Sequence, residues 1–154
     1  MSIIKKDRFK LVPAVFLLFF KEDKLLLLHR ANTGHNDGKY GLVSGHVDGE
    51  ESVRRAGVRE AYEEVGVSIN ENDLRFVHVM HRRKGSNDHE RVDFYFVVEK
   101  WQSEPGNTEP DKCDDLSWFP IEQLPKNLID YVQVAIESFR QGHLYSEFGW
   151  DKNP

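Results

Sequence analysis

The sequence predicts an α+β fold, an α/β/α sandwich in which a mixed β-sheet is flanked by helices. Segments rich in β-branched and aromatic residues outnumber the segments with helical periodicity, which are 52–65 and 128–141. Polar loops containing glycine or proline separate these elements. The chain has 154 residues, of which 39% are hydrophobic, and this is enough for one core. We therefore expect a single domain over residues 1–154 in which helices cover the sheet.

The first two predicted strands, Val12 to Phe20 and Lys24 to Arg30, are apolar runs joined by a short charged turn. Such a pair predicts a buried β-hairpin. Basic residues before the first run are similar to the start of a signal peptide, but Pro13 interrupts the run and no small-residue cleavage site follows. The run is also shorter than the roughly 20 apolar residues that span a bilayer. We therefore expect a cytoplasmic protein with no contact to a membrane.

The middle of the chain predicts a loop, a turn and a helix. Residues 31–40 are polar, and Gly41 to Val43 reads as a short extended piece that leads into a glycine-rich turn from Ser44 to Gly49. Apolar residues at helical spacing predict a helix from Ser52 to Val65. Gly66, just past the end of this helix, is a residue type that commonly stops one.

The C-terminal half predicts three more strands and a second helix. These segments are the strands Leu74 to Arg83, Val92 to Trp101 and Leu116 to Phe119, and the helix Leu128 to Gln141. The polar loops 84–91 and 102–115 flank the second of these strands. The tail from Leu144 to Trp150 carries three aromatic residues. They must cover apolar surface on their own subunit or on a partner, so a homodimer is one of two alternatives.

Charge and cysteine usage exclude several classes of protein. The net charge of −5 disfavours a general grip on nucleic-acid phosphates, so no nucleic-acid partner is expected. The one cysteine, Cys113, cannot form a disulfide within the chain or build a cysteine-based zinc site. This count fits a reducing, cytoplasmic setting.

Three glutamates on the first predicted helix carry the chemistry. Glu60, Glu63 and Glu64 stand at positions i, i+3 and i+4, which share one helical face. Carboxylates crowded in this way repel one another unless a cation lies between them. Hard divalent ions such as Mg²⁺, Mn²⁺ or Ca²⁺ prefer oxygen ligands, and Mg²⁺ commonly adds substrate phosphates to its carboxylates. The spacing therefore predicts a magnesium-dependent site for a diphosphate, with solvated helix surface as the alternative.

The stretch from 45 to 67, GHVDGEESVRRAGVREAYEEVGV, resembles the Nudix box of the Nudix hydrolases. Every specified position of that motif is filled: Gly45, Glu51, Arg59, Glu60, Ala61, Glu63, Glu64, Gly66 and Val67. The order of the surrounding elements is similar to the Nudix fold over nearly the whole chain. The resemblance implies a Nudix-type mixed β-sheet flanked by helices, and an enzyme that acts on acid anhydrides of phosphorus.

The resemblance also implies the roles of the box residues. Glu60 and Glu64 would be the principal ligands of Mg²⁺, with Mn²⁺ as a substitute, and Glu63 would join them. The carbonyl of Ser44 or Gly45 would add a metal ligand. Arg59 and Glu51 would pair, and Arg59 would orient the ligand carboxylates.

The general base stays open at this point, because members of the family differ. Glu60 or Glu63 is the first choice. The acidic residues of the 102–115 loop are the second, namely Glu109, Asp111, Asp114 and Asp115. For any one of these loop residues, the alternative is a solvated acidic side chain.

Three basic or polar residues are candidates for binding substrate. Arg30 ends the second predicted strand, His46 lies beside the predicted metal site, and Arg82 belongs to a basic cluster around the 84–91 loop. The whole cluster is Arg82, Arg83, Lys84 and Arg91. Arginine suits bidentate contacts to phosphate. The alternatives are solvated strand ends for the cluster and a structural role for His46.

The predicted reaction is attack of water on a phosphorus of a nucleoside diphosphate derivative, a small-molecule nucleotide. Nudix enzymes that act on ADP-ribose usually carry a proline some 15 residues past the box, and this chain has no proline between Pro13 and Pro105. A nucleoside triphosphate is therefore the default substrate, as in MutT-like cleaning of the nucleotide pool. The alternative is a non-catalytic Nudix-like regulator, which the intact box carboxylates disfavour.

Overall fold

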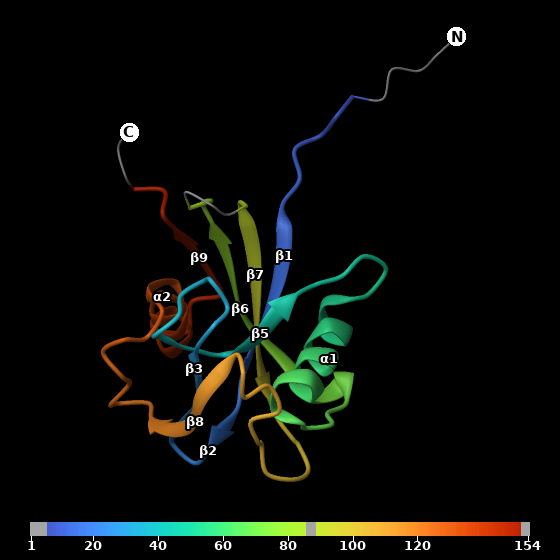
Figure 1. Ribbon diagram of the computed structural model, residues 1–154. Helices are drawn as coiled ribbons and strands as arrows, with labels where there is room; N and C mark the ends of the chain where they lie inside the picture. The colour runs from blue at the N-terminus through green and yellow to red at the C-terminus, as the bar shows by residue number, and fades with distance from the viewer. Residues whose placement is uncertain (1–5, 86–88, 152–154) are drawn as a thin grey trace.

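The structure is a computed structural model that describes residues 6–85 and 89–151 (Figure 1). Its strands are β1 (Val12–Leu18), β2 (Phe20–Lys21), β3 (Lys24–Arg30), β4 (Tyr40–Gly41), β5 (Val43–His46), β6 (Leu74–Arg82), β7 (Arg91–Val98), β8 (Cys113–Pro120) and β9 (Tyr145–Phe148). Its helices are α1 (Val53–Val65), a short 3₁₀ helix (Glu71–Asp73) and α2 (Asp130–Arg140).

The strands form two sheets. The larger sheet has five strands in the order β5-β1-β7-β6-β9 and is mixed, because β1 is antiparallel to β5 but parallel to β7. The smaller sheet contains β2, β3 and β4, with β8 paired to β3 along its length. The two sheets are connected covalently where β1 passes into β2.

Helices α1 and α2 lie on opposite sides of the five-stranded sheet, as Figure 1 shows. Strand β1 has both faces buried, because successive side chains alternate between two apolar cores. Phe16 belongs to the core shared with α2, whereas Val15 and Leu17 belong to the core shared with α1. This layered arrangement confirms the predicted α+β class.

Local signals in the sequence account for α1. The side chain of Ser52 caps its start by accepting a hydrogen bond from the Arg55 N–H at 3.1 Å. Gly66 ends it in the left-handed region, at φ 68°. Gly57 lets the helix approach the sheet closely, because an added Cβ would lie 3.2 Å from Leu74 and 3.3 Å from Leu17. The helix therefore begins at Val53, one residue later than predicted, ends at Val65 as predicted and is held tightly against β1.

The expectation of one hairpin from Val12 to Arg30 is wrong except at its tip. Phe20 and Lys21 pair with β3, but β1 leaves that ladder and joins the other sheet. The predicted turn from Ser44 to Gly49 is also wrong at its start, because residues through His46 form β5 against β1. In both cases the partner strand is distant in the sequence, so local patterning carries no sign of it.

Other boundaries differ by a few residues. Strand β8 begins at Cys113 rather than Leu116, since β3 supplies a partner for its whole length. Strand β7 ends at Val98, and α2 begins at Asp130. Such ends depend on tertiary contacts more than on propensity.

The C-terminal tail packs on its own chain. It forms β9, parallel to β6, and the Trp150 indole N–H donates to the His81 carbonyl at 3.2 Å. Phe148 packs against the core beneath α2, while Leu144 and Tyr145 are exposed. No helix in the described ranges is long and apolar enough to cross a membrane.

Candidate active site

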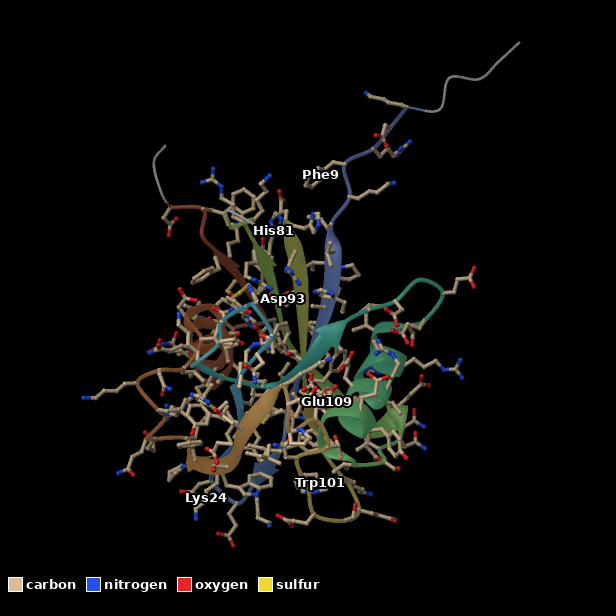
Figure 2. The ribbon with its side chains drawn as sticks, viewed as in Figure 1. Phe9, Lys24, His81, Asp93, Trp101 and Glu109 are labelled. Carbon is tan, nitrogen blue, oxygen red and sulfur yellow. The ribbon has the colours of Figure 1, made fainter. Side chains whose placement is uncertain are left out.

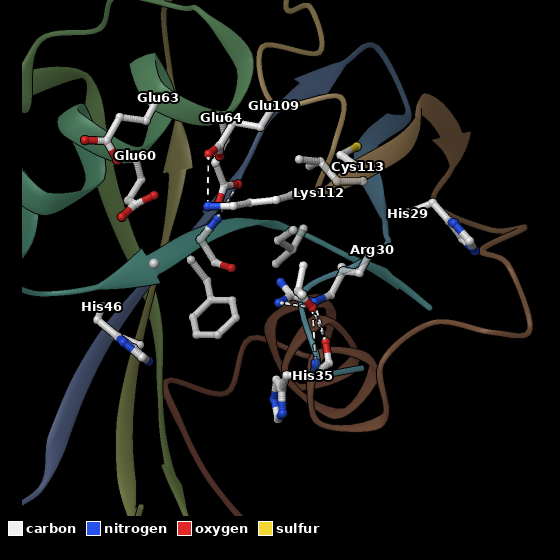
Figure 3. Close-up of a pocket in the computed structure, with 18 of the residues that line it drawn as sticks. His29, Arg30, His35, His46, Glu60, Glu63, Glu64, Glu109, Lys112 and Cys113 are labelled. Carbon is white, nitrogen blue, oxygen red and sulfur yellow. Dashed lines mark hydrogen bonds and ion pairs between the residues drawn. The ribbon is translucent and has the colours of Figure 1, made fainter. Parts of the chain in front are cut away.

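A pocket of about 560 Å³ is lined by residues of β1, β5 and α1, together with the C-terminal end of β3 and the first residue of β8 (Figure 3). Its lining includes four carboxylates, four cationic side chains and several histidines. The charged members are Glu60, Glu63, Glu64, Glu109, Arg30, Arg82, Arg91 and Lys112. All three predicted substrate-binding residues, Arg30, His46 and Arg82, line this pocket together with the three box glutamates.

Helix α1 aims two carboxylates at strand β5. The Ser44 N–H donates to Glu64 Oε2 at 3.2 Å, and the carboxylate of Glu60 lies directly over Gly45. Burial raises the pKa of Glu60 to about 7 and raises the pKa of Glu64 well above its usual range, and for Glu64 the charge of Glu60 adds to this effect. A divalent cation bound between these two neighbouring, partly buried carboxyl groups would keep both ionised.

Arg59 contacts three acidic residues of the box, namely Glu51, Glu60 and Glu63. Its Nη2 lies 2.7 Å from Glu51 Oε1 and donates to the His46 carbonyl at 3.0 Å. Its Nη1 lies 2.8 Å from Glu60 Oε1 and 3.3 Å from Glu63 Oε2. The expected Arg59–Glu51 pair is therefore present, and Arg59 also connects helix α1 to the end of β5.

The donor set fits a hard divalent cation. Within the described part of the chain, no three His, Cys, Asp or Glu side chains converge closely enough to form a cage by themselves. The Glu63 side chain is half exposed and turned to Arg59, while Glu60 and Glu64 face β5 (Figure 3). Every candidate ligand here is an oxygen, and Mg²⁺ commonly needs only one or two carboxylates beside water and phosphate. The partly buried Glu60–Glu64 pair could therefore provide the protein's share of such a site.

Gly45→Ala is expected to disrupt this pair while leaving the fold intact. An added Cβ would lie 2.1 Å from the carboxylate of Glu60, so that side chain must swing away from β5. We expect Mn²⁺ affinity, measured by titration calorimetry, to fall about 10- to 100-fold. Gly49→Ala is the matched control, since its Cβ would meet nothing within 4 Å. Equal affinity in Gly45→Ala and the unaltered protein would contradict this account of the site.

A loop after β7 brings a fourth carboxylate to the pocket. It docks on the C-terminus of α1, where the Thr108 hydroxyl donates to the Glu63 carbonyl at 2.5 Å and the Gly106 N–H donates to the Val65 carbonyl at 3.0 Å. These contacts place Glu109 beside Glu64, and its charge helps to raise the pKa of both Glu60 and Glu64 (Figures 2 and 3). Lys112 Nζ lies 3.5 Å from the Glu109 carboxylate.

The structure separates the four acidic candidates of this loop. Glu109 lines the pocket, whereas Asp111, Asp114 and Asp115 do not. Asp114 pairs with His29, and Asp115 accepts hydrogen bonds from Tyr40 and Ser117. Sequence alone did not distinguish Glu109 from its acidic neighbours.

The basic cluster around the 84–91 loop does not act as one surface. Arg82 is buried under α2, where its Nε lies 2.8 Å from Asp93 Oδ2 and its guanidinium lies 3.8 Å from the Tyr131 ring centroid. Arg83 lies over the ring of Trp150, and Arg91 contacts His46 at the pocket. Residues 86–88 of the loop lie outside the described part of the chain. Arg82 thus reaches the pocket wall from a structural ion pair, which the sequence did not indicate.

Four pocket residues from loops were missed from the sequence: Asn32, Thr33, His35 and Lys112. The first three lie in the polar loop after β3, and the fourth lies next to β8. Asparagine, glycine and aspartate are enriched in that first loop, as in many surface turns. Composition alone therefore gave no reason to assign these residues to a site.

Comparison with known proteins agrees with the geometry. A family model described as the NUDIX domain matches residues 10–140. The structure is similar to the MutT NUDIX hydrolase from Burkholderia pseudomallei, with 26% identity and a TM-score of 0.76 over 83% of this chain and 97% of that protein. It is also similar to the MutT protein from Methanosarcina mazei Go1 (21% identity, TM-score 0.74, coverage 91% and 97%). A NUDIX hydrolase from Nitrosomonas europaea has the same fold, with 24% identity and a TM-score of 0.73 over 88% of this chain and 93% of that protein. Because the family model spans most of the chain, the protein belongs to the NUDIX domain family and is a hydrolase that acts on acid anhydrides of phosphorus.

Proposed function

We propose that this protein is a Mg²⁺-dependent pyrophosphohydrolase that cleaves a nucleoside triphosphate to a nucleoside monophosphate and pyrophosphate. One observation carries the proposal: the partly buried Glu60–Glu64 pair and the side chain of Arg30 line the same pocket. Carboxylates that hold a divalent cation on one wall and an arginine on another are complementary to a polyphosphate. The substrate would be a small molecule, and the single buried cysteine, Cys113, is consistent with a cytoplasmic enzyme.

The charge of the pocket supports a triphosphate over a less charged derivative such as a nucleotide sugar. Once divalent cations balance the carboxylates, the guanidinium of Arg30 is placed to interact with substrate. Arg82 is already matched by Asp93. A chain of three phosphates would offer more negative charge to the bound cations and to the Arg30 guanidinium than the diphosphate of a nucleotide sugar.

Each group has a defined part in the proposed reaction. Glu60 and Glu64 would hold the cation, which when bound neutralises phosphate oxygens and polarises the attacking water. Arg59 fixes Glu60 through its 2.8 Å contact. Arg30 would bind the phosphates. The bound cation and the attacking water would be positioned by the site carboxylates, and positioning of this kind supplies a large part of the rate enhancement. Water would transfer its proton to a site carboxylate, and we propose Glu60 or Glu63 for this, with Glu109 as the alternative from the adjoining loop.

A substrate panel tests the proposal. The purified protein is incubated with Mg²⁺ and nucleoside triphosphates, nucleotide sugars or dinucleoside polyphosphates, and the products are separated by ion-exchange chromatography. We expect nucleoside monophosphate and pyrophosphate from one or more triphosphates, and less turnover of nucleotide sugars. Release of orthophosphate, or a preference for nucleotide sugars, would contradict the assignment. Tight nucleotide binding without turnover would favour the alternative of a non-catalytic regulator.

Cation binding is expected to weaken as the pH falls. Burial holds the carboxyl groups of Glu60 and Glu64 protonated at higher pH than usual, with the pKa of Glu60 at about 7. Mn²⁺ must displace these protons, so its affinity should be high above the raised pKa values and be lost as the pH drops through them. Thermal unfolding with and without Mn²⁺ should show a larger stabilising shift at about pH 8.5 than at about pH 5.5. A shift that does not depend on pH would contradict the raised pKa values.

A further inference from the structure

The loop between β3 and β4 is organised around the carboxylate of Asp37. The N–H groups of Thr33 and Gly34 donate to it at 3.1 Å and 2.9 Å, and the Thr33 hydroxyl donates to it at 2.5 Å. These hydrogen bonds, that of the Thr33 hydroxyl above all, lower the pKa of Asp37, so it is ionised at neutral pH. Asp37 thus fixes both the backbone and the hydroxyl of Thr33.

The same loop holds the guanidinium of Arg30 at two points. Arg30 Nε donates to the His35 carbonyl at 2.8 Å, and Nη2 donates to the Thr33 hydroxyl oxygen at 3.2 Å (Figure 3). The Thr33 hydroxyl therefore accepts from Arg30 and donates to Asp37. This chain of hydrogen bonds leads from Asp37 through Thr33 to Arg30.

The three residues joined by these hydrogen bonds differ in their access to a ligand in the pocket. Arg30 and Thr33 line the pocket, but Asp37 does not. Within residues 6–85 and 89–151, no carboxylate lies in ion-pair contact with Arg30, whose guanidinium donates to a carbonyl and a hydroxyl. Neutral acceptors thus fix the direction of the guanidinium and leave it without an ion-pair contact among these residues. A flexible arginine would lose rotamer freedom on binding an anion, and this loop has already imposed that order.

We propose that Asp37 is a positioning residue, which acts through Thr33 to hold Arg30 ready for a phosphate group of the substrate. The proposal rests on the proposed function for the identity of the anion as a phosphate chain. Asp37 makes no contact with that anion, so its removal changes affinity only through Arg30. Its effect should fall on KM more than on kcat, because Arg30 grips the phosphates in both the ground state and the transition state.

A double-mutant cycle on phosphate binding tests this role. The probe is inorganic imidodiphosphate, whose bridging nitrogen resists hydrolysis, and its affinity is measured by calorimetry in the presence of Mg²⁺. Asp37→Asn and Arg30→Lys are each expected to weaken binding about tenfold, the loss of one charge-assisted hydrogen bond. The double variant should bind no more weakly than Arg30→Lys, since Asp37 has no other route to the ligand. Additive losses would overturn the proposal.

Two further variants keep the test clear. Thr33→Val removes the hydroxyl that links Asp37 to Arg30 and does not alter Asp37 itself. It should therefore reproduce the loss of probe affinity even where Asp37→Asn disturbs the loop backbone. Glu104→Gln is the matched control, because Glu104 is also an exposed carboxylate whose pKa a hydrogen bond lowers, but it pairs with Lys21 outside the pocket. The Glu104→Gln variant should bind the probe like the unaltered protein.

The outcomes separate this proposal from the proposed function. Coupled losses of probe binding, in a protein that hydrolyses nothing on the substrate panel, would support the role of Asp37 and remove the proposed reaction. Turnover of triphosphates, with Asp37→Asn indistinguishable from Glu104→Gln, would support the reaction and overturn the role of Asp37. Failure of the unaltered protein to bind imidodiphosphate would also overturn it.

Discussion

Glu64→Gln is expected to lower kcat/KM for the preferred nucleoside triphosphate by about a thousandfold or more, the size expected when one preorganised electrostatic contact is removed. The substitution keeps the shape of the side chain. It removes the negative charge of the carboxylate, which accepts a hydrogen bond from the Ser44 N–H and would bind the cation. Steady-state rates of pyrophosphate release, together with Mn²⁺ titration, measure the two effects.

The same substitution should leave the fold intact and even stabilise the metal-free protein. Burial raises the pKa of Glu64, so the ionised carboxylate opposes folding at neutral pH, and a neutral amide relieves this cost. Glu71→Gln is the control, since Glu71 is half-exposed, pairs with Arg55 at 3.6 Å and does not line the pocket. Unchanged turnover in Glu64→Gln would remove our assignment of the active site.

Asp93→Ala is expected to lower the free energy of unfolding by about 3–5 kcal/mol, because it removes the buried carboxylate that pairs with the buried guanidinium of Arg82. Asp93 is fully buried within β7, and its two oxygens lie 2.8 Å and 3.3 Å from nitrogens of Arg82, itself 6% exposed. The Tyr131 ring against the guanidinium supplies only part of the lost attraction. Urea unfolding followed by fluorescence measures the loss.

A compensating variant separates the buried charge from the loss of packing. The double substitution Arg82→Leu with Asp93→Leu removes both charges and replaces them by apolar side chains, so it should recover a large part of the stability. A cost below about 1 kcal/mol for Asp93→Ala would show that Arg82 reaches solvent on losing its partner. No recovery in the double variant would show that packing, rather than charge, governs the effect.

Helix α1 is the element that the sequence predicted most fully. Its end at Val65, its stop at Gly66 and the shared face of Glu60 and Glu64 all follow from local sequence and from spacing within one helix, where interacting residues are three or four positions apart. The resemblance to the Nudix box added the pairing of Arg59 with Glu51. These interactions are short in sequence, so a linear pattern contains them.

The larger errors fall where partners are distant in the sequence. Residues 44–46 read as a turn because their strand partner, β1, lies about thirty positions earlier. Arg82 read as a surface cation because nothing in its own segment shows that Asp93 comes to lie beside it in the sheet. Glu109 was one of four equivalent acidic residues until the loop docked on the end of α1.

The amino-acid sequence by itself determined the layered α+β class, the position of α1 and the acidic residues that define the chemistry, because helical periodicity and the box spacing are local properties. Only the tertiary structure decided which cations meet those acids, that Glu109 joins them, and that Asp37 holds Arg30 through Thr33. Such choices depend on which loops and strand ends are brought together. The free energy that brings them together comes from burial of the two apolar cores on either side of the sheet, which the whole chain shares.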